Sequence, residues 1–312
     1  MNVFKGKRFR RGLILKLRNI AILSPGEMGH SVGRYLRDGD FNVMTCTKGR
    51  SERTQKLSQK AGIQETGNLD ELVQSTDLIL AILVPDQAKN LAKKVAAAIH
   101  RTKVTPVYVD CNAISPETVC KIDRIVTGAG ARFVDGGIIG GPPTDKQMPR
   151  LYVSGSYENL VLPLDRYGLS VKPLGGEIGR ASGLKMCYAS VTKGITALQA
   201  AALITSWTLG LNNELLEEFS ESQAQRLKEM ENLKSISTKS FRWIGEMLEI
   251  AATYRQAGVT SSFHEGAAEI FSLIAESSIG NERSETLDLS HTLNETISIF
   301  AEHLERRQTE NP

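Results

Sequence analysis

The sequence predicts an α/β protein in which a doubly wound, mostly parallel sheet is followed by an all-helical domain. Short apolar runs alternate with amphipathic helical segments as far as Gly176, which is the pattern of a parallel sheet covered by helices. After Gly176 there is little strand signal, and an Ala- and Leu-rich stretch without proline predicts one long helix. We therefore expect a basic extension at 1–18, a nucleotide-binding domain at 19–176 and a helical domain at 177–312.

Composition excludes several classes of protein. No apolar run approaches the ~20 residues of a membrane span. Residues 1–18 carry seven Lys or Arg and no acid. The rest of the chain therefore holds 31 of the 38 basic residues and all 35 acids, and its mildly acidic balance does not indicate a nucleic-acid-binding core. The basic leader is typical of an organelle transit segment, a disordered extension or an upstream start codon. The four cysteines lack disulfide or metal spacing, so we expect them reduced and mostly buried, in the cytoplasm.

The expected elements follow from apolar periodicity and cap residues. Strands are expected at 20–23, 41–45, 78–83, 106–110, 132–135, 151–154 and 169–172. Helices are expected after 26, at 51–61, 69–75, 85–99 and 116–127, and then at 183–209, 214–233, 239–257, 264–279 and 284–307.

The first strand, turn and helix have the arrangement that a dinucleotide-binding fingerprint requires. Gly26 would let the backbone approach a pyrophosphate, Gly29 would let the helix pack closely on the strand, and the helix N-terminus supplies free N–H groups. Ser24 replaces the first glycine of the fingerprint, and it can make the turn if its φ stays negative. The alternative is an ordinary strand-to-helix turn. The predicted cofactor-binding residues here are Ser24, Pro25, Gly26, Glu27, Met28 and Gly29.

The end of the second strand predicts NADP rather than NAD. Thr47 stands where an acidic residue would bind the ribose hydroxyls of NAD. The cations Lys48, Arg50 and Arg53 lie close by, and Ser51 can donate a hydrogen bond, so the segment suits a 2′-phosphate. A solvated basic loop is the alternative, and NAD is the less favoured cofactor.

Three more loops follow strands at the carboxyl edge of the sheet, where ligands of open α/β sheets bind. The amide of Asn112 offers a donor and an acceptor, and the glycines of the third loop leave N–H groups that could hold a carboxylate. A structural turn explains these glycines nearly as well. The predicted ligand residues are Val84, Pro85 and Ala88 for the cofactor and Asn112, Gly140 and Gly141 for the substrate.

Lys185 opens the long helix among apolar residues. A lysine in such surroundings must snorkel, pair or line a cavity. A buried lysine has a lowered pKa and can act as general acid or base, although most helical lysines are simply solvated.

Together these motifs resemble the β-hydroxyacid dehydrogenase superfamily of hydroxyisobutyrate and 6-phosphogluconate dehydrogenases, over about residues 19–300. The runs 242–247 and 263–268 resemble a subgroup with a short 6-phosphogluconate-dehydrogenase-like C-terminal domain. The resemblance implies a Rossmann domain, a helical domain that dimerises, and hydride transfer at a hydroxyl or carbonyl carbon. It also implies that Lys185 is the general acid/base and that the loop at Gly140 holds the substrate carboxylate.

The chain departs from the family pattern at two positions. Asn112 stands where serine is usual, and Ala189 where asparagine is usual. Tyr188, beside Ala189, could replace that asparagine as a hydrogen-bond donor, or act as an acid in imine chemistry. Glu246 and His264 could reach the cleft, where acids would favour a cationic substrate, although core or dimer packing explains their surroundings as well.

We therefore expect an NADP-dependent oxidoreductase of the β-hydroxyacid dehydrogenase type. It would act as a homodimer on a small hydroxy acid or carbonyl compound, with neither nucleic acid nor membrane as partner. Two alternatives stay open: an imine reductase on the same fold, and an NADP-binding dimer that has lost catalysis.

Overall fold

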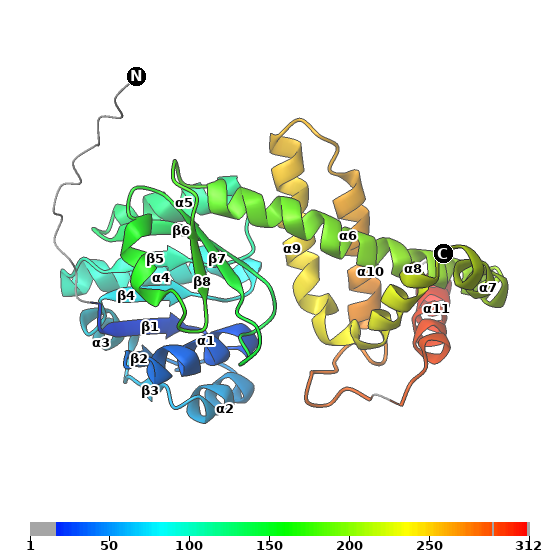
Figure 1. The fold of residues 1–312 in the computed structure, drawn as a ribbon, viewed down its shortest axis with the longest axis horizontal. Helices are drawn as coiled ribbons and strands as arrows, with labels where there is room; N and C mark the ends of the chain where they lie inside the picture. The colour runs from blue at the N-terminus through cyan, green and yellow to red at the C-terminus, as the bar shows by residue number, and fades with distance from the viewer. Residues whose placement is uncertain (1–16, 289, 311–312) are drawn as a thin grey trace, which may run out of the picture.

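A long helix, α6 (Arg180–Thr208), joins a sheet-containing domain to a helical domain (Figure 1). The computed structural model describes residues 17–288 and 290–310. Residues 1–16 of the predicted basic extension lie outside the described residues. Leu17 is buried, and the Arg18 N–H donates to the carboxylate of Asp77 at 3.0 Å, so both belong to the first domain. Over the described ranges, no helix is long and apolar enough to cross a membrane.

The sheet has eight strands in the order β3-β2-β1-β4-β5-β6-β7-β8. The strands are β1 (Asn19–Leu23), β2 (Asn42–Thr45), β3 (Gln64–Glu65), β4 (Leu78–Ala81), β5 (Val107–Asp110), β6 (Arg132–Ile139), β7 (Arg150–Ser154) and β8 (Ser170–Pro173). All neighbours pair in parallel except β6 and β7, which confirms the predicted mostly parallel sheet. The chain turns back between β1 and β4, and such a switch point is where ligands of these sheets bind.

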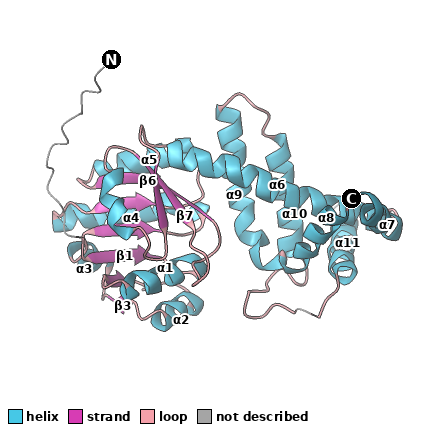
Figure 2. Ribbon diagram, viewed as in Figure 1, coloured by secondary structure: helices cyan, strands magenta, loops and turns pink. Residues whose placement is uncertain are grey.

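Helices cover both faces of this sheet (Figure 2). They are α1 (Glu27–Asp38), α2 (Glu52–Lys60), α3 (Leu69–Gln74), α4 (Pro85–Thr102), α5 (Pro116–Thr127) and the 3₁₀ helix η1 (Glu158–Leu164). Ser51, Asn68 and Ser115 cap helices by accepting N–H groups of the first turn. Because the sheet is covered on both faces, β1 and β4 are buried along most of their length, which explains their unbroken apolar sequences.

The described residues of the second domain contain helices and connecting loops, and no strand. It contains α7 (Asn212–Ser222), α8 (Ala224–Met230), the 3₁₀ helix η2 (Glu231–Ser235), α9 (Ser237–Gln256), α10 (Ser262–Glu276) and α11 (Leu293–Glu310). The single helix expected at 214–233 is wrong, because the chain breaks at Gln223. The helix expected from 284 begins only at Leu293, because residues 277–288 form a loop that reaches the first domain through an ion pair between Glu285 and Arg53.

Two sets of buried contacts fix the domains against each other. The carboxylate of Asp135 accepts hydrogen bonds from the N–H groups of Gly179 and Ala181 at 2.9 and 3.0 Å, which anchors the start of α6 on β6. Glu249 of α9 accepts the Ser115 N–H at 2.7 Å. Gly245 packs so tightly on the first domain that a Cβ there would lie 2.7 Å from the Asp86 carboxylate. These contacts hold α6 and α9 over the carboxyl edge of the sheet.

Candidate active site

A cleft of about 540 Å³ opens between the two domains at the carboxyl edge of the sheet. Its walls come from the turn after β1, the loops after β2, β4, β5 and β6, and the facing sides of α6 and α9. It therefore lies where the switch point of the sheet predicts a ligand.

The turn after β1 uses Ser24 in the left-handed conformation, with φ of +62°, so the expectation of a negative φ is wrong. The turn is closed by a hydrogen bond from the Gly26 N–H to the Ser24 carbonyl at 2.7 Å, and the Arg50 guanidinium donates to the Ser24 hydroxyl. Ser24 thus adopts the backbone conformation that glycine adopts readily. We attribute the stability of this conformation to the hydrogen bond from Arg50, which holds the Ser24 side chain in addition to the backbone hydrogen bond of the turn.

The start of α1 has the close packing that the glycine fingerprint predicts. A Cβ on Gly29 would lie 3.2 Å from Ile22 and 3.3 Å from the Ser24 carbonyl, so a larger residue would crowd β1 at this point of the helix. Gly26, Glu27 and Met28 line the cleft, whereas Pro25 is buried below it. Glu27 also faces the helical domain, where its carboxylate lies 3.8 Å from Arg242.

The basic loop after β2 divides into two parts. Arg50, Ser51 and Arg53 line the cleft together with Thr54. Thr47 is buried, and Lys48 is exposed; neither lines the cleft. The structure thus brings together two of the three cations predicted for a 2′-phosphate. Arg53 is held by Glu285 at 2.8 Å.

The loops after β4 and β5 are tied to each other through the side chain of Asn112. Asn112 is buried, and its side-chain oxygen accepts the Leu83 N–H at 2.8 Å. Its neighbours Cys111 and Ala113 line the cleft, but Asn112 does not, so the structure does not bring the predicted substrate ligand to the site. Val84 lines the cleft, while Pro85 and Ala88 are buried in the first turn of α4.

The loop after β6 offers backbone rather than side chains. Gly140 lines the cleft and has a φ of +121°, which favours glycine. Gly141 is exposed and lies outside the cleft lining. The structure therefore places one of the two predicted glycines at the site.

Lys185 projects from the second turn of α6 into the cleft, where its ammonium donates to the Cys111 carbonyl at 3.3 Å. Burial lowers the pKa of Lys185; with Glu246 opposing the shift and Lys193 adding to it, the pKa is about 8. A group with this pKa can release or accept a proton near neutral pH. Tyr188, one turn further along α6, also lines the cleft and is 48% exposed.

Glu246 lines the cleft but already has cationic partners. The Lys193 ammonium contacts its carboxylate, and Arg242 Nε lies 3.5 Å from it. Burial alone would raise the pKa of Glu246, but Lys193, Arg242 and Lys185 hold it below its usual value. The carboxylate is therefore ionised and paired, and the expectation that it favours a cationic substrate finds no support here.

His264 lies inside the helical domain and not in the cleft. It is buried, and its ring Nε2 lies 2.8 Å from the Ser190 hydroxyl, which also contacts the Tyr254 hydroxyl at 2.7 Å. Other lining residues had no distinct sequence signal: Phe241 of α9, and Arg283 and Ser284 of the loop 277–288. Only the fold of that loop brings the last two to the site.

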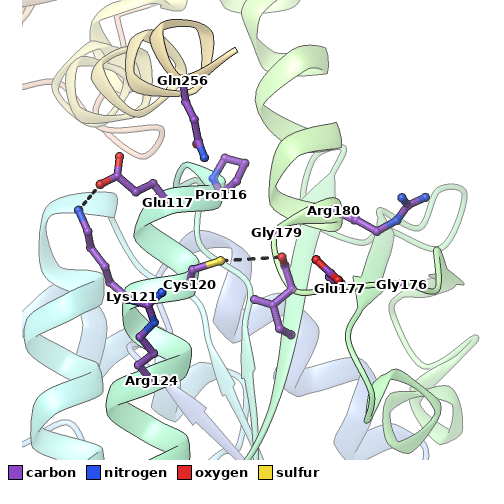
Figure 3. A pocket seen from close by; sticks show the side chains of 11 residues that line it. Pro116, Glu117, Cys120, Lys121, Arg124, Gly176, Glu177, Gly179, Arg180 and Gln256 are labelled. Carbon is purple, nitrogen blue, oxygen red and sulfur yellow. Dashed lines mark hydrogen bonds and ion pairs between the residues drawn. The ribbon is translucent and has the colours of Figure 1, made fainter. Parts of the chain in front are cut away.

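A second pocket, of about 690 Å³, lies between α5, Gln256 and the segment that precedes α6 (Figure 3). Its charged residues include Glu117 and Lys121, which pair with each other at 2.6 Å. The Cys120 thiol donates to the Ile178 carbonyl at 3.8 Å. This pocket contains none of the predicted site residues.

Comparison with known proteins agrees with this geometry. Residues 19–162 match the NAD-binding domain of 6-phosphogluconate dehydrogenase, and residues 208–274 match a domain of unknown function, DUF1932. An uncharacterised 28.5 kDa protein of Methanothermus fervidus is 30% identical over 211 residues, which are 68% of this chain and 80% of that protein. The chain belongs to the β-hydroxyacid dehydrogenase superfamily.

Two solved structures share this fold. A conserved protein of unknown function, reported as structurally similar to 3-hydroxyacid dehydrogenases, is 27% identical with a TM-score of 0.58 and covers 83% of this chain and 97% of its own. A 3-hydroxyisobutyrate dehydrogenase from Salmonella typhimurium, 13% identical, has a TM-score of 0.67 over 90% of this chain and 99% of its own, a likeness of fold. The family prediction is confirmed, and by family the chain is an NAD(P)-dependent dehydrogenase or reductase.

Proposed function

We propose that the chain is an NADP-dependent oxidoreductase that interconverts a small hydroxy acid and its carbonyl form, with Lys185 moving the proton. The observation that carries this proposal is the position of the Lys185 ammonium. It lies in the same cleft as the glycine turn at the start of α1, and its pKa is about 8.

The residues of the cleft fit a nicotinamide dinucleotide. The Gly26–Gly29 turn would hold the pyrophosphate, because Gly29 lets α1 pack closely on β1 and the first N–H groups of α1 are free of side-chain caps. Arg50 and Arg53 would hold a 2′-phosphate at the mouth of the cleft, which supports NADP over NAD. When bound, the nicotinamide supplies or accepts the hydride.

Lys185 completes the reaction by handling the proton. In the reducing direction its ammonium donates a proton to the oxygen that develops negative charge as the carbon receives hydride. In the oxidising direction the neutral amine accepts the hydroxyl proton as hydride leaves. The Cys111 carbonyl orients the ammonium, and the backbone at Gly140 is open for the substrate carboxylate.

An imine reductase is the second candidate, and one observation favours it. Ala189 offers no amide beside Lys185, whereas the Tyr188 side chain lines the cleft and carries a hydroxyl that can donate a proton. This hypothesis predicts NADPH-dependent reduction of cyclic imines and no turnover of hydroxy acids.

We also propose that two copies of the chain associate through α6. Its exposed apolar side chains recur every three or four residues and form one stripe: Leu184, Tyr188, Val191, Ile195 and Leu198. The stripe extends seven residues to either side of Val191, so antiparallel packing on a two-fold axis near Val191 would bury it against itself. Val191→Glu is expected to convert a dimer to a monomer in sedimentation analysis; an unchanged mass would contradict this interface.

The proposed activity is tested by following NADPH absorbance with a panel of β-hydroxy acids, the matching carbonyl compounds and cyclic imines. We expect turnover with hydroxy acids or carbonyl compounds, and a loss of about 10²-fold or more in Lys185→Met with NADPH still bound. Turnover of imines alone would select the second candidate. NADPH binding without turnover of any compound would indicate a chain that has lost catalysis.

A further inference from the structure

Two lysines project into the cleft from the same face of α6. Lys193 lies eight residues after Lys185, so about 12 Å of helix separates their Cα atoms. Ala189 lies midway between them and contributes only a methyl group to the cleft lining. Tyr188 and Thr192 line the cleft on either side of Ala189, so a ligand that extends from one lysine to the other meets the methyl group of Ala189 between two hydroxyl groups.

Lys193 is fixed so that its ammonium borders the cleft. Its side chain is 14% exposed and that of its partner Glu246 is 9% exposed. The Lys193 ammonium also lies 5.5 Å from the centre of the Trp243 ring. A buried ion pair of this kind adds little net stability compared with apolar packing, so its place in a cleft wall suggests a role in binding.

The charges around this end of the cleft do not balance. The charged groups that face it from the elements packed here are Lys185, Lys193 and Arg242, against the carboxylates of Glu246 and Glu27. Among the described residues, Arg242 Nε lies 3.5 Å from the Glu246 carboxylate but makes no hydrogen bond, and the three-donor Lys193 ammonium has one hydrogen bond, to Glu246. Donors left over beside a net positive charge fit an anionic oxygen group.

We propose that Lys193, Arg242 and Trp243 form a second anion-binding subsite, which takes the distal carboxylate of a dicarboxylic hydroxy or oxo acid. The inference rests on the proposed function only in placing the reacting carbon of that substrate at Lys185. The near carboxylate lies by the backbone at Gly140, and the far carboxylate lies over Ala189, beside Lys193. Substrates with a single carboxylate leave these donors unpaired.

Trp243 makes binding directly observable, since the sequence has two tryptophans and Trp207→Phe leaves Trp243 as the reporter. The full-length protein with that substitution is titrated with succinate, glutarate and adipate, and with butyrate, valerate and caproate as chain-length controls. Titrations are run with and without NADP⁺. We expect at least one dicarboxylate to bind about 10-fold or more tightly than its matched monocarboxylate.

Variants of Lys193 assign that preference. Lys193→Met is expected to remove it while NADPH affinity stays unchanged, and Lys193→Arg is expected to restore part of it. Equal affinities for the two series, or a preference that survives in Lys193→Met, would overturn the subsite. A Lys193-dependent preference in a protein that turns over no substrate would leave the subsite in place and remove the proposed oxidoreductase function.

Discussion

Replacing Lys185 with methionine should stabilise the protein while it abolishes proton transfer. Burial lowers the pKa of Lys185 from its ordinary value of 10.5 to about 8. At about 1.4 kcal/mol per pKa unit, holding the ammonium in the folded state costs about 3 kcal/mol at neutral pH. Methionine has a similar length and no charge, so we expect Lys185→Met to raise the free energy of unfolding by about 2–3 kcal/mol.

The pH dependence of this gain has a definite sign. Below pH 8 the lysine is protonated in both the folded and the unfolded chain, so the cost is constant. Between pH 8 and 10.5 the folded chain loses the proton first, so wild type gains stability relative to the variant. Urea unfolding of both proteins at neutral pH and near pH 10 measures the difference. A destabilised variant, or a gain that does not shrink at high pH, would refute the reasoning.

Lys193→Met is the matched control for this prediction. It removes a lysine from the same side of the same helix, but it also leaves the buried carboxylate of Glu246 without its ion pair to Lys193. We expect it to lower the free energy of unfolding by about 3 kcal/mol, opposite in sign to Lys185→Met. Effects of equal sign in the two variants would show that the environment of Lys185 is not what lowers stability.

Three further predictions concern the cofactor and pH. Glu285→Gln frees Arg53, so NADPH should bind several-fold more tightly with NADH unaffected; equal changes in the two titrations would contradict the role of Arg53. In steady-state assays the reduction rate should fall as pH rises past about 8 while the oxidation rate increases, because Lys185 must be protonated only for reduction; rates that ignore pH in this range would exclude it as the proton carrier. Burial lowers the pKa of His264, so wild type should lose stability as pH falls below about 6.5, and His264→Gln should lose less over the same unfolding series; equal acid sensitivity would show that another group governs it.

The sequence predicted the fold class because a doubly covered sheet leaves a strong pattern. Strands such as β1 and β4 are buried on both faces, and runs of Ile, Leu and Ala identify them without any tertiary information. The edge strand β3 has two exposed residues, Gln64 and Glu65, and no such signal. The break at Gln223 also escaped the pattern, because neither proline nor glycine marks it.

The parts of the candidate site that depend on backbone conformation could be predicted from the sequence. The parts that depend on which side chains contact each other could not. Gly26 and Gly29 follow from the packing of α1 on β1. The direction of Asn112 depends on the Leu83 N–H, which is distant in sequence, and the pairing of Glu246 depends on how α9 lies against α6. Long-range contacts of this kind leave no periodic trace in the sequence.

The central claim, that the cleft between the domains is an NADP site, is tested most directly by equilibrium titration of the protein with NADPH and NADH, followed by intrinsic fluorescence. We predict that NADPH binds about 10-fold or more tightly than NADH, and that Arg50→Ala removes most of that difference. Binding of neither cofactor would contradict the account and leave only the fold.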